Sequence, residues 1–280
     1  MSWRRRERVE LKTPEQIALM RRAGALIAEV HRQVREAIQP GVTTLQLDTL
    51  AETIIRDHGA TPNFKGYQGF PATLCVSVNE EIVHGIPGDR VIHDGDVVSV
   101  DGGCVVEGWH SDSAFTAIAG QPRNDEDVRL VDVTERAMWA GIAAFASANR
   151  VGDIGAAVED EVFSLVGEEL CHLEDFGGHG IGTAMHQPPD VMNFRTRDRG
   201  PKVCAGMCLA IEPMLVDGPA DYAVLEDDWT IVTTSGRRAA HWEHSVARTD
   251  DGILVLTAAD GGVAGLEPFG VTPVSDPLTA

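Results

Sequence analysis

Four acidic residues lie inside or beside apolar runs of the sequence, where an isolated charge is costly. Asp101 ends the run VVSV and Glu212 ends the run CLAI, while Asp112 lies in WHSDS and Glu243 in HWEHS. Burial of an ionised carboxylate costs several kcal/mol unless the group is paired or coordinates a metal. The chemistry open to these residues is therefore ion pairing or metal binding.

Ion pairing is the simpler explanation for any one of the acids, but it does not account for four. Arg248 is the nearest basic residue in these segments, and one guanidinium cannot neutralise four carboxylates. Two divalent cations can. Oxygen ligands together with one imidazole suit Co, Mn, Fe or Zn better than a thiolate site would, so we expect two divalent ions whose identity stays open.

Three histidines are candidates for the imidazole: His84, His179 and His186. His179 lies in FGGHGIG, where the flanking glycines let the backbone and the ring approach a crowded site, and His186 follows shortly before a Pro-Pro pair. We expect His31, His58 and His172 to be ordinary polar residues. His110 and His244 lie close to Asp112 and Glu243 in the sequence, and we expect them to point to the opposite face of the sheet.

The elements that must position these residues are two helices followed by strands. Thr13, Pro14 and Gln16 form a capping-box start for a helix that ends at Pro40-Gly41, and a second helix spans residues 43–59. Alternating runs at 73–79, 96–103 and 113–120 indicate antiparallel strands. A chain reversal at residues 106–108 would bring Asp101 and Asp112 together on neighbouring strands.

The same order of elements recurs in the second half of the chain. Helices are expected at 124–146 and 151–170, and strands at 207–215, 229–234, 241–249 and 252–257. VHGIP resembles GHGIG, DGDVVSVD parallels AGMCLAIE, and WHSDS parallels HWEHS, in the same order. We therefore expect an α+β fold built from a duplicated helix-helix-strand unit, with both halves contributing to one antiparallel sheet that helices cover.

Composition limits the classes of partner. The 280 residues carry a formal net charge of −20, so the bulk surface should repel DNA and anionic membranes. The basic cluster WRRRER is expected to be a solvated N-terminus, with an electrostatic contact to ribosomal RNA as the alternative. Five cysteines without a CxxC pair, a charged N-terminus and no long apolar run predict a reduced, cytoplasmic protein without a membrane segment.

The motifs VHGIP, VDGG, GHGIG, IEPM and WEHS together resemble those of type I methionine aminopeptidases, in the pita-bread metallopeptidase family. The likeness runs from about residue 13 to 257, which we expect to be one catalytic domain between a short arm (1–12) and an irregular tail (258–280). The resemblance implies that Asp112 and Glu243 bridge two metals, that Asp101 completes one, and that His179 with Glu212 completes the other.

The resemblance also implies substrate-binding and catalytic residues. His84 and His186 would contact the substrate near the scissile amide, and Glu212 would transfer a proton between the attacking water and the leaving amine. By motif position the pocket for the methionine side chain would be lined by Tyr67, Phe70, Cys75 and Trp229, with Met185 at a position that is often aromatic. Plain core packing is the alternative for Tyr67 and Phe70.

The implied activity is removal of the initiator methionine from nascent polypeptides whose second residue is small, by a monomer. Only 32 residues separate His179 from Glu212, which leaves no room for the helical insertion of type II enzymes. The alternatives are an Xaa-Pro peptidase on the same fold and a non-catalytic interaction module. Relatives of the second kind lose ligands, whereas all five are present here.

Overall fold

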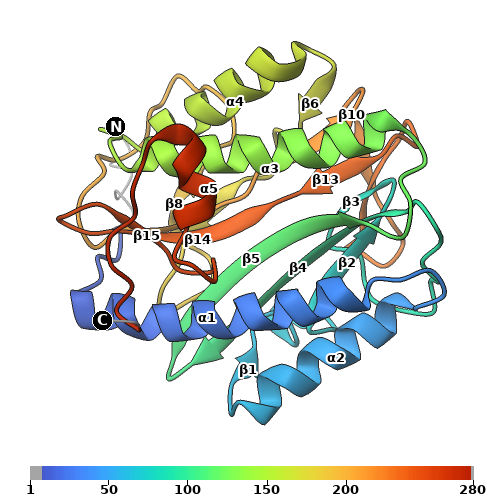
Figure 1. Ribbon diagram of the computed structural model, residues 1–280, viewed down its shortest axis with the longest axis horizontal. Coiled ribbons are helices and arrows are strands. Elements are labelled where there is room, and N and C mark those ends of the chain that lie inside the picture. Colours follow the sequence, from blue (N-terminus) through green and yellow to red (C-terminus); the bar gives the residue numbers. More distant parts are fainter. Residues whose placement is uncertain (1–7, 279–280) are drawn as a thin grey trace, which may run out of the picture.

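Four long helices frame the computed structural model, which describes residues 8–278 (Figure 1). The predicted order of two helices and then strands, twice over, is confirmed. Of the basic cluster WRRRER only Arg8 is within the described residues. The helices are α1 (Pro14–Ala37), α2 (Thr44–Asp57), α3 (Asp125–Phe145) and α4 (Gly152–Val166).

The starts of the first two helices follow the predicted local chemistry. The side chain of Thr13 accepts a hydrogen bond from the Gln16 N–H, and the side-chain oxygen of Gln16 accepts one from the Thr13 N–H, so the capping box of α1 is confirmed. Thr43 and Gln46 repeat the arrangement at α2. Each box satisfies two N–H groups that have no partner inside the helix.

Nine antiparallel strands form the main sheet, and both halves of the chain contribute to it as predicted. The strand order is β1-β4-β5-β14-β9-β7-β8, with β2 beside β4 and β15 beside β14. The strands are β1 (Thr61–Pro62), β2 (Leu74–Val78), β4 (Val97–Val106), β5 (Trp109–Ile118), β7 (Gly178–Gly180), β8 (Gln187–Val191), β9 (Cys208–Ile211), β14 (Glu243–Arg248) and β15 (Ile253–Val255).

Two small sheets of three strands each accompany the main sheet. One has the order β13-β10-β6 and the other β11-β12-β3. Most of these strands contain only three residues, which is too short for a periodic pattern to be recognised. They are β3 (Glu81–Val83), β6 (Leu170–His172), β10 (Met214–Asp217), β11 (Tyr222–Val224), β12 (Ile231–Thr233) and β13 (Ala239–His241).

Two segments predicted as single strands are each divided in two. The segment 207–215 breaks at Glu212-Pro213 into β9 and β10, and the segment 241–249 breaks at Trp242 into β13 and β14. Pro213 has no N–H to continue the ladder, and its carbonyl instead accepts the Trp242 N–H at 3.3 Å. The breaks let both segments pass from the main sheet into the β13-β10-β6 sheet beside the acidic residues.

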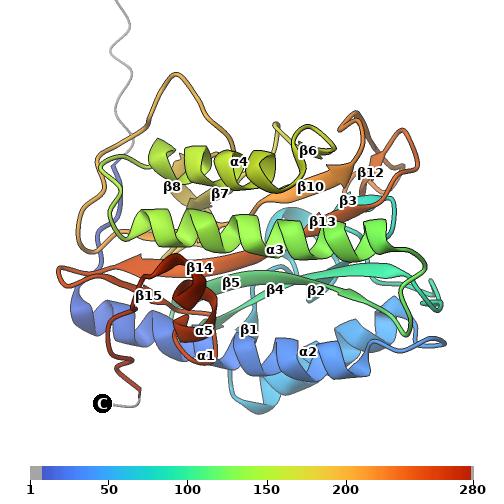
Figure 2. The ribbon, with the colours of Figure 1, turned by 45° about the horizontal axis from the view of Figure 1, so that its top comes forward.

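Helices cover one face of the main sheet (Figure 2). α1 packs on β4 and β5, and α3 packs on β5 and β14. A Cβ built on Gly102 would lie 3.8 Å from Ile27 Cδ1, so this position of β4 faces α1. Because side chains alternate along a strand, the neighbouring Asp101 is turned to the opposite face, away from α1.

The region after residue 257 packs against the domain. It contains the short helices α5 (Val263–Leu266) and η2 (Glu267–Phe269), separated from the end of the chain by residues without regular structure. The buried guanidinium of Arg21 forms an ion pair with Asp276 at 2.7 Å and donates to the Leu256 carbonyl. No helix in the described part of the chain is long and apolar enough to cross a membrane.

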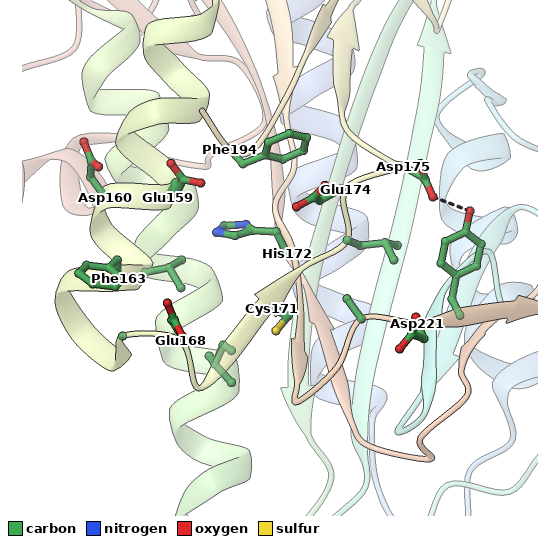
Figure 3. Close-up of a pocket in the computed structure, with 16 residues that line it drawn as sticks. Glu159, Asp160, Phe163, Glu168, Cys171, His172, Glu174, Asp175, Phe194 and Asp221 are labelled. Carbon is green, nitrogen blue, oxygen red and sulfur yellow. Dashed lines mark hydrogen bonds between the residues drawn. The ribbon is translucent and has the colours of Figure 1, made fainter. Parts of the chain in front are cut away.

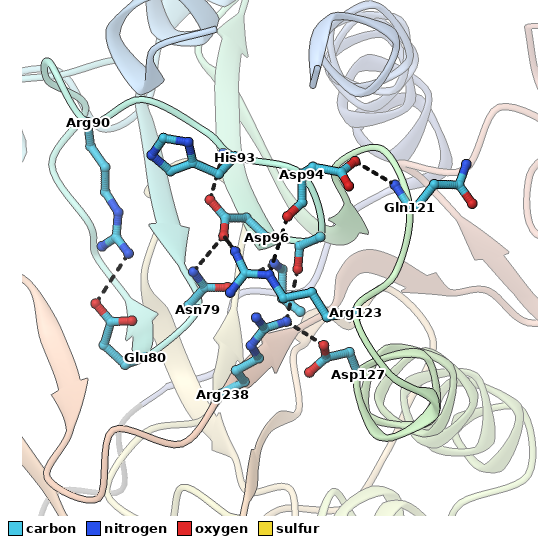
Figure 4. A network of polar contacts seen from close by, with 12 residues as sticks. Asn79, Glu80, Arg90, His93, Asp94, Asp96, Gln121, Arg123, Asp127 and Arg238 are labelled. Atoms are coloured by element: carbon cyan, nitrogen blue, oxygen red, sulfur yellow. Dashed lines mark hydrogen bonds and ion pairs between the residues drawn. The ribbon is translucent and has the colours of Figure 1, made fainter. Parts of the chain in front are cut away.

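A polar network joins the loop before β4 to the start of β13 (Figure 4). The Asp96 carboxylate accepts from the His93 N–H, the Asn79 amide and the Arg123 guanidinium. Arg238, the residue before β13, donates to the Gly95 carbonyl and to Asp127 of α3. The start of β13 is thereby tied both to a loop of the first half and to a helix of the second.

Candidate metal centre

The β4–β5 hairpin brings Asp101 and Asp112 together. Glu107 and Gly108 form its two-residue turn, and both have positive φ values of 50° and 83°, as a type I′ turn requires. In the resulting register Asp101 lies opposite Ala114 and Asp112 lies opposite Gly103. The two acids are therefore diagonal neighbours on the same face of the sheet.

The second half of the chain adds the other candidate ligands from three strands. Glu243 begins β14 and lies opposite Ala114, Glu212 follows β9, and His179 is the middle residue of β7. The ligand atoms of Asp101, Asp112 and Glu243 all lie within 4.8 Å of one another, and so do those of His179, Glu212 and Glu243. The structure thus brings together all five residues expected to be metal ligands.

Glycines around His179 permit this close approach. A Cβ on Gly178 would lie 2.1 Å from the Ala210 carbonyl oxygen of β9, and one on Gly180 would lie 2.4 Å from the Pro188 oxygen of β8. No side chain fits at such distances. The glycines let β7 lie between these two strands with the imidazole at the acidic cluster.

Burial raises the pKa of every carboxyl group in the cluster. The pKa of Asp101 is raised to about 7 and that of Glu212 to about 8, in both cases mainly by burial. Burial and the neighbouring carboxylates raise the pKa values of Asp112 and Glu243 well above their usual range. Without a cation, the cluster therefore resists carrying four negative charges.

The residues fit a divalent cation in their hydrogen bonding as well as in their charge. Asp101 Oδ1, Asp112 Oδ1 and Glu243 Oε1 are buried and have no hydrogen-bond partner in the part of the chain that the structure describes. Within residues 8–278 no Lys or Arg forms an ion pair with any of the four acids. Buried lone pairs without a donor are the groups that a metal ion would satisfy.

His179 is prepared to be a ligand. Burial lowers its pKa to about 3, so the ring is neutral. Nδ1 lies 3.0 Å from the Gly180 carbonyl, which requires the proton on Nδ1, while Nε2 lies 3.5 Å from Glu212 Oε1 and 4.0 Å from Asp112 Oδ2. The ring therefore turns an unprotonated nitrogen toward the carboxylates, as metal-binding histidines do.

An aromatic cavity of about 250 Å³ opens beside the cluster. The rings of Phe70 and Trp229 meet edge to face at 5.1 Å, and Phe64 packs on Phe70 at 6.4 Å. Burial and the nearby carboxylates raise the pKa of the Cys75 thiol well above its usual range, so this wall is uncharged. All four residues expected in the pocket, Tyr67, Phe70, Cys75 and Trp229, line it together with Phe64, Gln68 and Met185.

His84 and His186 stand at the same cavity. His186 lies 4.2 Å from His179 between ring centroids, and its Nδ1 is 2.8 Å from the Tyr67 hydroxyl. His84 has a positive φ of 60°, lies edge to face with Trp229 and Phe176, and has its pKa lowered to about 4 by burial. The structure therefore places both histidines beside the candidate ligands.

Sequence reasoning did not identify His241, which lies behind the cluster. Its ring is buried, and its Nε2 lies 3.4 Å from Glu212 Oε2 without another polar partner. The signal was available in HWEHS, since residues two apart on an extended chain point the same way and His241 precedes Glu243 by two. Glu212 is thus flanked by His179 on one side and by His241 on the other.

Comparison with known proteins agrees with this chemistry. The model of metallopeptidase family M24 matches residues 18–250. Methionine aminopeptidase 1 of Bacillus subtilis is 42% identical over 246 residues, which cover 88% of this chain and 98% of that protein. Methionine aminopeptidase 1 of Mycobacterium tuberculosis is 44% identical over 258 residues, covering 91% and 97%.

Solved structures show the same likeness. The methionine aminopeptidase of Thermotoga maritima superposes with a TM-score of 0.85 at 38% identity, and the match covers 90% of this chain and all of that one. The prolidase from Pyrococcus furiosus has a TM-score of 0.70 at 19% identity and is matched over only 65% of its length. The second likeness extends to the fold alone.

Proposed function

The chain belongs to metallopeptidase family M24, and we infer from this premise that it removes the N-terminal methionine from polypeptides by metal-dependent hydrolysis. The observation that carries the inference is the cluster of four carboxylates and one neutral imidazole, with buried oxygens that lack donors, beside an aromatic cavity. The extensive identity with methionine aminopeptidases over nearly their whole length supports it.

We propose that the five residues hold two divalent ions. Asp112 and Glu243 would contact both ions, Asp101 would complete one site, and His179 with Glu212 the other. Four carboxylates balance the charge of two such ions, and the donor set suits Co, Mn, Fe or Zn. When bound, the ions supply Lewis-acid activation of the attacking water and of the substrate carbonyl.

Glu212 is the group we assign to proton transfer. Its carboxyl lies at the edge of the cluster between the imidazoles of His179 and His241, and a carboxylate in this position can accept and return a proton. It would take the proton of the attacking water and deliver it to the amine that leaves. His241 would hold Glu212 Oε2 by donating from Nε2, and His179 flanks the other oxygen.

His186 and His84 would bind the scissile amide. The Tyr67 hydroxyl fixes the His186 ring through Nδ1, which leaves Nε2 as the nitrogen free for the substrate. Burial lowers the pKa of His186, so its neutral ring would donate from Nε2 to the oxygen of the scissile carbonyl, which gains negative charge. His84, held between Trp229 and Phe176, would bond the amide of the second residue.

The aromatic cavity would bind the methionine side chain. Phe70, Trp229 and Cys75 present an uncharged wall, and Met185 adds a flexible thioether that packs well against another. Because the cavity ends at the carboxylates, the free α-amino group of the substrate would lie beside negative charge. We propose that the second residue of the substrate is small and that the enzyme works as a cytoplasmic monomer on newly made chains.

The test is release of methionine from the peptide Met-Ala-Ser. The metal-loaded protein should cleave it, and chelation or Asp112→Ala should abolish cleavage while leaving the fold, measured by circular dichroism, intact. Cleavage of Xaa-Pro dipeptides instead of Met-Ala-Ser would identify an Xaa-Pro peptidase. Tight metal binding without turnover of any peptide would identify a non-catalytic module.

A further inference from the structure

A groove outside the metal centre has no role in the proposed mechanism (Figure 3). It lies between helix α4 and strand β6 on one side and the residues leading into β11 on the other, with a volume of about 940 Å³. Its floor is apolar and buried, formed by Val162, Leu170 and Leu173. Phe163 of α4 stands at its edge with 63% of its surface exposed. The exposed ring of Phe163 is available to contact a chain that lies in the groove.

The walls of the groove carry only negative charge. Among the described residues, no Lys or Arg lines the groove, whereas acidic side chains line it along its length: Glu159, Asp160, Glu168, Glu174, Asp175 and Asp221. Arg195 pairs with Glu159 and Asp160 at the α4 end. Within residues 8–278, Glu168, Glu174 and Asp221 form no ion pair, so the rest of the groove is uncompensated.

A polar atom in the middle of the groove also lacks a partner. Figure 3 shows His172 of β6 between α4 and Glu174. Its Nδ1 is buried and has no hydrogen-bond partner among the described residues. Because this atom is covered by its neighbours, a chain lying in the groove would reach it only after a rotation of the His172 ring.

Aromatic rings connect the groove to the metal centre. The His84 ring lies 5.9 Å from that of Phe176, and Phe176 lies 5.6 Å from Tyr222. Tyr222 belongs to the groove, where its hydroxyl donates to Asp175 at 3.0 Å. An extended chain advances about 3.3 Å per residue, so three to four residues cover this path.

We propose that the groove binds the substrate polypeptide itself, downstream of the scissile bond, and favours Lys and Arg there. The proposal rests on the proposed function, because it takes the polypeptide held at His84 by its second residue to continue past Phe176 toward Tyr222. Residues from about the fifth onward then reach the acidic walls, and apolar residues between them reach Phe163 and the floor. The uncompensated charge fits a basic segment and repels nucleic acid.

The experiment compares peptides that differ only in the part that reaches the groove. Three twelve-residue peptides begin Met-Ala-Ser-Gly and carry Lys, Ser or Glu at alternate positions from five to eleven, and the tripeptide Met-Ala-Ser is the short reference. We expect the Lys peptide to have a KM about three- to tenfold below that of the Glu peptide at low ionic strength, with kcat unchanged. Salt at about 0.5 M should remove most of the difference.

Charge-removing variants locate the effect. The triple variant Glu174→Gln, Asp175→Asn and Asp221→Asn should bring the KM values of the Lys and Glu peptides together. Its activity on the tripeptide should not change, since no residue of that substrate reaches the groove. The matched control is Asp57→Asn, Asp250→Asn and Asp251→Asn, which removes three exposed acids at α2 and at the turn before β15 and should keep the preference.

The possible outcomes separate the two proposals. If the tripeptide is not cleaved, the proposed function is wrong. If it is cleaved but the Lys and Glu peptides have equal KM values, only the groove proposal is wrong. If both triple variants lose the preference equally, the net charge of the protein selects the peptide, and the groove proposal is again wrong.

Discussion

Replacing Asp101 by Asn should stabilise the metal-free protein and destabilise the metal-loaded one. In the absence of metal, burial raises the pKa of the Asp101 carboxyl group from its usual 3.8 to about 7. An acid whose pKa is raised on folding binds its proton more tightly in the folded state than in the unfolded state. Its contribution to stability therefore becomes less favourable as pH rises from about 4 through 7.

The size of the effect follows from the pKa difference. Each pKa unit corresponds to about 1.4 kcal/mol, so the carboxyl costs the metal-free protein about 1–2 kcal/mol at pH 5 and about 4 kcal/mol at pH 8. Burial of the new amide offsets about 1–2 kcal/mol of the gain. We expect Asp101→Asn to leave the apoprotein unchanged at pH 5 and to raise its Tm by about 4–8 °C at pH 8.

Bound metal should make the wild type more stable than Asp101→Asn at pH 8, which is the reverse of the order in the metal-free proteins. An ion at 1,000 times its Kd stabilises the native state by about 4 kcal/mol, and the variant should lose most of this gain because a ligand is missing. Calorimetric melting of both proteins, with chelator and with Mn²⁺, measures all four states, and Asp57→Asn is the control for removal of an exposed acid. A chelated variant that melts below chelated wild type at pH 8, or one that keeps the full metal-induced shift, would refute the reasoning.

Three further predictions concern residues behind the site and in the core. His241→Leu should weaken metal binding by about 10–100-fold in titration calorimetry, whereas His241→Gln, which keeps a donor toward Glu212, should stay within a few-fold of wild type. Burial lowers the pKa of His31 from 6.5 to about 3, so the neutral ring contributes fully to the free energy of unfolding above pH 6.5, and this contribution is lost as the pH falls. Wild type should therefore lose free energy of unfolding between pH 7 and pH 5, and His31→Leu should reduce this loss by about 2 kcal/mol. Gly24→Ala places a Cβ 2.0 Å from the Leu256 oxygen and should cost about 1–3 kcal/mol in urea unfolding, against under about 0.5 kcal/mol for Gly88→Ala, where the nearest atom is 4.0 Å away.

Much of the helical framework could be predicted because its causes are local. Thr13 and Gln16 are three residues apart, and the capping box they form needs no other part of the chain. The amphipathic pattern of α1 and the alternation in β4 and β5 report which face is buried. The hairpin register that joins Asp101 to Asp112 likewise depends on a two-residue turn.

The weak points of the prediction are short strands and breaks. Pro213 gives a local reason for the break in the segment 207–215, but the break at Trp242 depends on a hydrogen bond to the Pro213 carbonyl, which is nearly thirty residues away. The spacing of His241 and Glu243 places the histidine on the side of the acids, but only the folded chain shows that its ring reaches Glu212. The groove beside His172 is likewise assembled from α4, β6 and the residues before β11.

The sequence by itself indicated which acids need compensation, because a carboxylate inside or beside an apolar run requires a cation wherever the strand lies. The duplicated order of motifs also determined that two such sets exist and must be brought together. Only the tertiary structure decided which oxygens are left without donors, which nitrogen of His179 faces them, and how the cavity and groove adjoin. These are properties of distances between strands from both halves of the chain, and burial sets the pKa values that follow from them.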